Sequence, residues 1–465
     1  MQAIQSRPIS QPPLYITNTQ PIQTTVQPPL TVNTHNPNND IERPFVFQPG
    51  QRLNDKYEVV GLIGRGTFST VLHCRLLDSN RQRHDSIINQ GRGAHLAAQC
   101  CVAVKIVRDV ERYRRAAERE ITLLDWLRSC VRNTPPNIIN QQSMNGYYNA
   151  YNDGRHGLIE LLDAFIYDSR YVCMVFPLYG LSLYDFLYYN RFLPLFPHHI
   201  KHIAQQLITT IAYLHDLHIV HADIKPENIL LIDSAHQTIQ IEHLTVNVPL
   251  NTTVKLIDFG TAVMDNTTQK PKIVASRSYR SIEVVLDIGW SYGVDIWSAG
   301  CVLMELYSGT RLFNLHSTCS DNEHITMMES ILGPIPNWMK KQSRLFNTMD
   351  IQPSPQPILH DINQRASKYN QYMDNSNNDL LLNNDSNNIP LVPGQTSPYM
   401  RNRQSLTQSP SQHNLLQQQL NIPKLRDRVV ATDELFYDLI SQMLRYEPAQ
   451  RITAKQALRH PYFNS

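Results

Sequence analysis

Cysteine is scarce in this sequence, and its spacing is unlike that of a disulfide-rich or zinc-binding protein. The 465 residues include seven cysteines, an odd number, and no two of them have CxxC spacing. Disulfide frameworks use paired cysteines, and structural zinc sites use closely spaced ones. We therefore expect free thiols and a reducing compartment.

Long apolar runs and an excess of one charge are also missing. The most apolar stretch, residues 172–189, is broken by Pro177 and Asp185, and the opening MQAIQSRPISQPPL has no apolar centre like that of a signal peptide. Lysine and arginine number 42 against 40 aspartates and glutamates, so no strong field points to nucleic acid or an anionic membrane. We expect no secretion, no membrane insertion and no direct binding to nucleic acid.

Several stretches have no helical or strand periodicity. Residues 1–50 are rich in proline and glutamine and carry few charges, and residues 342–422 are biased toward asparagine and glutamine. Such compositions bury too little apolar surface to offset the entropy of ordering. We predict a disordered tail over 1–50, a disordered insert over 342–422, and two shorter polar inserts at 78–99 and 131–156.

The remaining sequence is long enough for two or three domains, or for one large two-lobed unit. Strand-like runs occur at 57–63, 69–77, 101–107, 161–167 and 171–178, and a helical pattern spans 109–129. After Gly180 the pattern is mainly helical. We predict an α+β fold with a small lobe over 51–179, built of five antiparallel strands and one helix. A larger, mainly helical lobe is predicted over 180–341 and 423–465.

A glycine-rich hairpin follows the first strand run. Gly64 and Gly66 lack Cβ atoms, which would let backbone N–H groups approach phosphates. A strand comes next, and not a helix, which disfavours a Rossmann site, and Ser69 stands where a third glycine would be. Taken alone, the hairpin fits an ordinary β-turn equally well.

Lys105 lies in an apolar strand run, where its ammonium needs a counter-charge unless the strand is a solvated edge. Glu120 falls on the apolar face of the helix that follows, three positions after Ala117. A carboxylate directed inward needs a cation. Pairing Lys105 with Glu120 would satisfy both groups and leave the lysine close to an anionic ligand.

The densest signal is HADIKPEN at residues 221–228, followed by Asp258-Phe259-Gly260. Asp223, Asn228 and Asp258 together supply oxygen ligands for Mg²⁺ and one further carboxylate that can act as a base. Lys225 would neutralise a transferring phosphoryl group. The order of these motifs makes a purely structural role for the whole set improbable.

With every motif in order, residues 57–341 and 423–463 resemble a eukaryotic protein kinase. The resemblance implies that Lys105 holds the α- and β-phosphates of ATP and pairs with Glu120, and that Asp223 is the catalytic base. It implies that Lys225 contacts the γ-phosphate, and that Asn228 and Asp258 bind Mg²⁺, with Mn²⁺ as an alternative. The implied ATP-binding residues are Ile63, Gly64, Gly66, Val71, Ala103, Lys105, Phe176, Pro177, Tyr179, Ser182, Asp185 and Leu230.

Further segments narrow the resemblance to one branch. Residues 323–334 read EHITMMESILGP and resemble the EHLAMMERILGP signature of the LAMMER, or Cdc-like (CLK), kinases of the CMGC group. Residues 180–186, 276–280 and 286–290 resemble the same family. The resemblance implies transfer to serine and threonine, and also to tyrosine, on protein substrates, with Arg/Ser-rich splicing factors expected. It implies a nuclear location, with the cytoplasm as the alternative.

Departures from the kinase pattern bear on regulation. Ala222 replaces the arginine that would bind a phosphorylated activation loop, so we expect Arg277 and Arg280 to order that segment without phosphate. Glu283 keeps the glutamate of the usual APE motif and is expected to pair with Arg451. Phe259 and Gly260 complete the Asp-Phe-Gly motif.

Three alternatives remain open at this stage. Residues 67–71 also resemble SR-protein kinases, whereas the tyrosine expected of DYRK kinases is absent, since that position is Ile273. A pseudokinase scaffold would bind partners without catalysis. The presence of every expected catalytic and metal-binding residue favours an enzyme.

Overall fold

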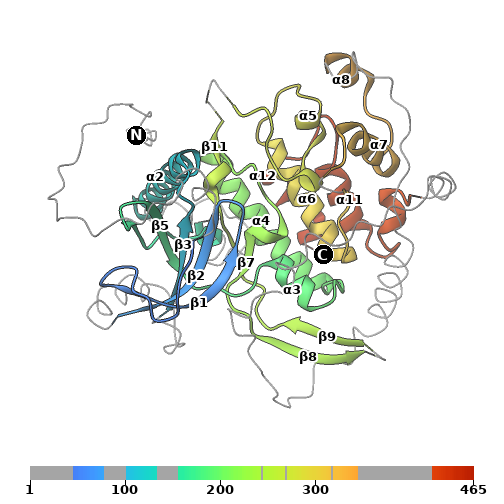
Figure 1. Ribbon diagram of the computed structural model, residues 1–465. Coiled ribbons are helices and arrows are strands. Elements are labelled where there is room, and N and C mark those ends of the chain that lie inside the picture. Colours follow the sequence, from blue (N-terminus) through green and yellow to red (C-terminus); the bar gives the residue numbers. More distant parts are fainter. Residues whose placement is uncertain are drawn as a thin grey trace, which may run out of the picture.

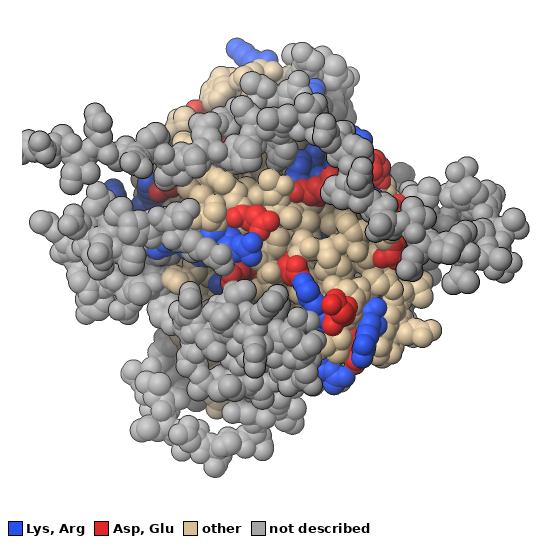
Figure 2. Space-filling model, turned by 90° about the vertical axis from the view of Figure 1, so that its left-hand side faces the viewer, with Lys and Arg blue, Asp and Glu red and all other residues tan. Residues whose placement is uncertain are grey.

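The computed structural model describes residues 45–77, 101–133, 155–241, 244–265, 267, 270–315, 318–343 and 422–464. These residues form a small lobe with a β-sheet and a larger, mainly helical lobe (Figure 1). The predicted insert at 78–99 and nearly all of the one predicted at 342–422 lie outside the described residues. On the face shown in Figure 2, acidic and basic side chains lie beside one another.

The small lobe contains one antiparallel sheet with the strand order β1-β2-β3-β5-β4. Alternate residues such as Leu72, Val104 and Val175 point into a buried cluster, as the period-2 pattern predicts. The five predicted strands are confirmed. Their bounds are β1 Tyr57–Arg65, β2 Ser69–Leu76, β3 Cys101–Val107, β4 Asp163–Tyr167 and β5 Tyr171–Pro177.

This lobe begins earlier than the sequence predicts. Phe45 is only 5% exposed and packs edge-on against Tyr167 and Tyr171, at centroid distances of 5.7 and 5.0 Å. The Gly50 N–H donates to the Val59 carbonyl at 2.8 Å. The predicted tail over 1–50 is therefore wrong for 45–50. This short segment buries an aromatic ring, and the composition of the whole stretch does not reveal a single buried residue.

Helix α2, Glu111–Asn133, packs against β3 and β5 of the sheet (Figure 1). Its buried residues Ala117, Leu124 and Leu127 follow the helical period. The helix extends past the predicted end at 129, so the insert predicted over 131–156 starts too early. A single 3₁₀ turn, Arg155–Gly157, follows the undescribed residues of that insert.

The large lobe is built around α6, in which residues 294–307 are all buried. Such a helix lies at the centre of a core, and α4 and α11 pack on it. The helices are α3 Leu183–Tyr189, α4 Pro197–Asp216, α5 Ile282–Val285, α6 Gly293–Ser308, α7 Asp321–Leu332, α8 Asn337–Gln342, α11 Glu434–Met443 and α12 Ala454–Ala457. Among the described residues, no helix is both long and apolar enough to cross a bilayer.

Two short strand pairs flank the loops of the large lobe that contain residues 221–228 and 257–262. Strand β7 (Ile229–Leu231) pairs with β10 (Val254–Leu256), and β6 (Ile219–Val220) pairs with β11 (Val263–Met264). These pairs bring residues 221–228 beside residues 257–262. The two motifs that the sequence separates are thereby adjacent.

A hairpin in the large lobe was not predicted. Strands β8, His236–Ile241, and β9, Leu244–Pro249, pair with each other and lie below α3 in Figure 1. The inward residues Ile239 and Val246 pack with Leu193. The alternation is visible in the sequence, but the mainly helical surroundings concealed it.

The described residues also move both ends of the predicted 342–422 insert inward. Gln342 belongs to α8, and Ser343 is buried, with its hydroxyl donating to the Leu286 carbonyl at 2.8 Å. At the other end, Ile422 packs against the core.

Candidate active site

Lys105 pairs with one carboxylate from each lobe. Its Nζ lies 2.9 Å from Glu120 Oε2 and 2.9 Å from Asp258 Oδ1. Glu120 is only 4% exposed and also accepts the Phe259 N–H at 3.2 Å. The apolar face of α2 directs this carboxylate inward, and the sequence predicts the pairing for that reason.

The electrostatics of this cluster favour a charged lysine. Burial alone would lower the pKa of Lys105, but Glu120 and Asp258 outweigh it and raise the pKa. Burial would raise the pKa of Asp258, yet the Lys105 ammonium holds it below its ordinary value. The pKa of Glu120 is raised by burial, which exceeds the opposing effect of Lys105. A permanent cation therefore lies beside Asp258.

The loop of residues 221–228 is shaped by a buried carboxylate on α6. Asp295 accepts the backbone N–H groups of His221 and Ala222, each at 2.9 Å. His215 Nε2 lies 3.0 Å from the same carboxylate. Ala222 has a φ of 64°, in the left-handed region that an L-residue seldom adopts, and these two hydrogen bonds hold it there.

Asp223 is the centre of a second polar cluster. Lys225 Nζ lies 2.6 Å from its Oδ2, and Asn228 Nδ2 donates to its backbone carbonyl at 2.9 Å and to Oδ2 at 3.2 Å. The Ser276 hydroxyl and backbone N–H both donate to Asp223 Oδ1, at 2.9 and 3.0 Å. Lys225 also donates to the Ser276 hydroxyl at 3.0 Å.

Two hard oxygen donors lie at the same end of a strand pair. Asn228 immediately precedes β7, Asp258 closely follows β10, and the Ile257 N–H donates to the Asn228 carbonyl at 2.9 Å. An amide oxygen beside a carboxylate suits a divalent cation such as Mg²⁺. The donor chemistry therefore fits the predicted metal ligands.

The predicted ATP-binding residues come from neighbouring strands. Val71 is paired in register with Lys105, and Ala103 with Phe176. Leu230 forms a bridge with Ser182. The others lie along β1 and the turn after it (Ile63, Gly64 and Gly66) or at and beyond the end of β5 (Pro177 and Tyr179).

Ser182 and Asp185 are engaged with each other. Ser182 is the N-cap of α3, where its hydroxyl accepts the Asp185 N–H at 3.0 Å and donates to the Asp185 carboxylate at 2.7 Å. Burial raises the pKa of Asp185. The structure shows a helix cap, and the ATP-binding role of these two residues stays a prediction.

Two arginines near the end of the segment from Asp258 to Glu283 bind acceptors in the protein, without a phosphate group. Arg277 pairs with Asp321 on α7 at 2.9 Å. Arg280 Nη2 donates to the Ala275 carbonyl at 2.9 Å, and Nε to the Val274 carbonyl at 3.0 Å. Each arginine thus has an acceptor within the protein.

A buried ion pair fixes the end of this segment. Arg451 makes a bidentate pair with Glu283, at 2.7 and 2.9 Å, with side-chain exposures of 0% and 1%. The remaining guanidinium hydrogen bonds go to carbonyls, including that of Gly293 at 2.8 Å. Full satisfaction of both charges is what permits their burial.

Comparison with known proteins agrees with this geometry. The family model of the protein kinase domain matches residues 91–463. The chain belongs to the protein kinase family. It is 31% identical over 431 residues to the dual specificity protein kinase CLK2 of Homo sapiens, covering 91% of this chain and 67% of that protein. For CLK4 of Homo sapiens the identity is 32% over 435 residues, covering 92% and 70%.

A plant protein and a solved structure extend the likeness. The serine/threonine-protein kinase AFC2 of Arabidopsis thaliana is 29% identical over 438 residues, covering 91% of this chain and 81% of its own. A crystal structure of a kinase domain is 25% identical, with a TM-score of 0.63, and covers 90% of this chain and 98% of that one. The chain is therefore a CLK-type protein serine/threonine kinase that uses ATP and a divalent cation on protein substrates.

Sequence reasoning missed the part that Asp295 has in this kinase. A charged residue inside the apolar run of α6 was a usable signal, because buried charges need partners. Sequence reasoning also did not predict the contact between Ser276 and Asp223, which are 53 residues apart. No local pattern indicates that contact.

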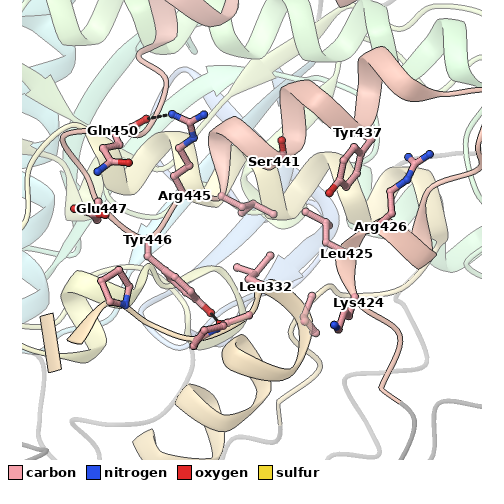
Figure 3. A pocket seen from close by; sticks show the side chains of 15 residues that line it. Leu332, Lys424, Leu425, Arg426, Tyr437, Ser441, Arg445, Tyr446, Glu447 and Gln450 are labelled. Atoms are coloured by element: carbon pink, nitrogen blue, oxygen red, sulfur yellow. Dashed lines mark hydrogen bonds between the residues drawn. The ribbon is translucent and has the colours of Figure 1, made fainter. Parts of the chain in front are cut away.

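A pocket of about 630 Å³ lies elsewhere in the large lobe of this kinase (Figure 3). It is lined by the end of α7, by residues 424–426, by α11, by residues 444–447 and by Gln450. The Tyr446 hydroxyl donates to the Gly333 carbonyl at 2.9 Å across its floor. None of the predicted site residues lines it, so this pocket is separate from the Asp223 cluster.

Proposed function

We propose that this kinase transfers the γ-phosphate of ATP, with Mg²⁺, to serine and threonine hydroxyls of Arg/Ser-rich proteins such as splicing factors. The cluster around Asp223 carries the proposal. There the hydroxyl of Ser276 already lies within hydrogen-bond distance of both the Asp223 carboxylate and the Lys225 ammonium. A substrate hydroxyl taking the same position has a proton acceptor and a cation beside it.

The proposed mechanism divides the work between the two clusters. Asp223 orients the attacking hydroxyl and accepts its proton as the hydroxyl oxygen bonds to the γ-phosphorus and the bond from that phosphorus to the bridging oxygen breaks, so that ADP leaves. Lys225 neutralises the transferring phosphoryl group, and Lys105, held by Glu120, positions the α- and β-phosphates. Mg²⁺ held by Asn228 and Asp258 would offset the negative charge of the phosphates, and Mn²⁺ suits the same donors.

The names of two relatives bear on the acceptor residue. CLK2 and CLK4 are named dual specificity kinases, which favours tyrosine as a further acceptor.

The backbone beside Ser276 bears on the residue that follows the acceptor. Ala275 has a φ of 60°, and its carbonyl is occupied by Arg280, so it is not available to a substrate N–H beside Ser276. A proline after the acceptor has no N–H to leave unpaired, and we expect it to be favoured there.

The test compares peptides that differ at one feature. An arginine-serine repeat peptide, its lysine-serine analogue, a version with proline after the acceptor and a version with tyrosine as acceptor are assayed with ATP and either Mg²⁺ or Mn²⁺. The proposal expects the highest kcat/KM for the arginine peptides, a gain from proline, and measurable transfer to tyrosine. Equal kcat/KM for the arginine and lysine peptides would remove the Arg/Ser assignment.

We also propose a nuclear site of action, because splicing factors act in the nucleus. The full chain fused to a fluorescent protein is expected to accumulate there. A signal confined to the cytoplasm would contradict this.

A further inference from the structure

The glycine-rich turn between β1 and β2 touches helix α2 through two aromatic rings. Phe68, at the tip of the turn, is 56% exposed. Its ring nevertheless meets that of Tyr113 edge-on, with centroids 4.9 Å apart and planes at 68°. This is a favourable geometry for an aromatic pair. The contact joins the turn, which in the proposed function covers the phosphates of ATP, to the helix that carries Glu120.

The backbone of the turn is also tied to the residue that follows β3. The Arg108 N–H donates to the Phe68 carbonyl at 3.0 Å. The Arg108 guanidinium donates to the Gly66 carbonyl at 3.0 Å. Within the turn, the Gly66 N–H donates to the Ser69 carbonyl at 2.9 Å. These hydrogen bonds fix the position of the turn relative to β3 and place Phe68 beside α2.

Tyr113 is itself held in place. Its backbone N–H donates to the Val110 carbonyl at 2.8 Å as α2 begins. The Arg112 guanidinium lies 4.7 Å above its ring and donates to its hydroxyl at 2.9 Å. The ring also packs against the core. A side chain held in this way can transmit a displacement of the turn to the helix.

Helix geometry places Tyr113 and Glu120 on one face of α2, about two turns or about 10 Å apart along the axis. Glu120 binds Lys105 on β3, and Arg108, three residues further along the chain and just past the end of β3, binds the turn. The turn, β3 and α2 are thus each in contact with the other two. A displacement of any one of these elements would strain its contacts with the others.

We propose that Tyr113 is a positioning residue that couples the glycine-rich turn to the Lys105–Glu120 pair. It does not take part in the chemistry. Its ring keeps the turn lowered over the phosphates only while α2 holds Glu120 against Lys105. The affinity for nucleotide and the position of Lys105 then both depend on the contact between Phe68 and Tyr113.

The first experiment separates the ring from its hydroxyl. Tyr113→Leu keeps apolar bulk but removes the ring edge, and Tyr113→Phe keeps the ring. We expect Tyr113→Leu to raise KM for ATP about 2- to 10-fold, with KM for the peptide unchanged, and Tyr113→Phe to restore the wild-type KM. A KM for ATP unchanged in Tyr113→Leu would overturn the proposal.

The second experiment is a double-mutant cycle with Phe68→Leu. Because both substitutions break the same contact, the double variant should raise KM for ATP no more than the larger single effect. Multiplying effects would show that Phe68 and Tyr113 act independently, which contradicts the coupling. Hydrogen exchange of residues 62–72 should accelerate in Tyr113→Leu, and unchanged exchange would also count against it.

A matched control is Phe45→Leu, which removes an edge-on contact to Tyr171 with centroids 5.0 Å apart in the same lobe. It should lower the melting temperature and leave KM for ATP unchanged. A rise in KM equal to that of Tyr113→Leu would mean that any loss of packing in this lobe has the same effect.

Discussion

Glu305 is a carboxylate buried within α6, with only 2% of its surface exposed. Burial raises its pKa to about 7, although the hydrogen bond from Tyr279 and the charge of Arg311 act in the opposite direction. The Tyr279 hydroxyl donates to it at 2.6 Å, and Arg311 lies 3.9 Å away. This side chain therefore titrates near neutrality inside the core of the large lobe.

Because the folded pKa of Glu305 lies above its unfolded value, the fold favours the protonated form. Its contribution to stability is complete below about pH 4.5 and is lost as pH rises through about 7. Glu305→Gln should abolish that loss, so the free energy of unfolding of the variant should gain about 2 to 3 kcal/mol relative to wild type between pH 5 and 8. Denaturant melts across this range measure it. Parallel curves for the two proteins would contradict the account, and Glu118→Gln, at an exposed position, is the control.

At this scale the sequence predicts a contact where a pattern constrains it. Glu120 could be paired with Lys105 because its place on an apolar helix face leaves it no solvent. Asp295 contacts Ala222 across 73 residues, and no periodicity relates two such positions. The fold alone brings them together.

The activation segment, residues 258–283, is held by several contacts of its side chains. Lys270 pairs with Asp265 and lies 5.2 Å from the Trp290 ring. The Trp290 indole donates to the Pro271 carbonyl at 2.8 Å. With Arg277 and Arg280 also bonded to protein acceptors, the described part of this segment is held by contacts within the protein.

We therefore expect the kinase to be active without phosphate on this segment. Peptide phosphorylation should be almost unchanged by phosphatase treatment, with the phosphorylation state followed by mass spectrometry. The reason is that Ala222 provides no cation for a phosphate, while the existing ion pairs already hold the segment. A loss of about 100-fold on dephosphorylation, near the upper range of allosteric coupling, would show that a phosphate switch exists.

Elements follow the sequence wherever one periodicity persists. The five strands of the small lobe and helix α2 lie close to their predicted ranges. The β8–β9 hairpin was not predicted because its alternating pattern covers only a few residues between helical stretches. The burial of Phe45 was not predicted because a single buried ring does not change the composition of a segment.

At the scale of the whole molecule, the two lobes meet through the Lys105–Asp258 pair and share a core that includes Ala117 and Phe259. The chain leaves the described large lobe at Ser343 and re-enters it at Ile422. Both of these residues pack on the core. The two parts of the large lobe are thus joined by side-chain contacts as well as by the chain between them.

Replacing residues 344–421 by a short glycine-serine linker should leave catalysis nearly intact. Their composition contributes little core, and loop length costs free energy only logarithmically. Ser343 and Ile422 are retained because they are packed. A thermal melt and a peptide assay on this variant check the expectation. A large fall in melting temperature would show that the removed residues pack on the lobes.

The central claim is that Asp223 is the base of an active phosphoryl-transfer site assembled from both lobes. The most direct test measures peptide phosphorylation and ATP affinity for Asp223→Asn, with Asp216→Asn at the exposed end of α4 as control. The account predicts unchanged ATP affinity and a fall in phosphoryl transfer of at least about 10²–10⁴-fold for Asp223→Asn alone. Near-normal turnover in that variant would contradict it.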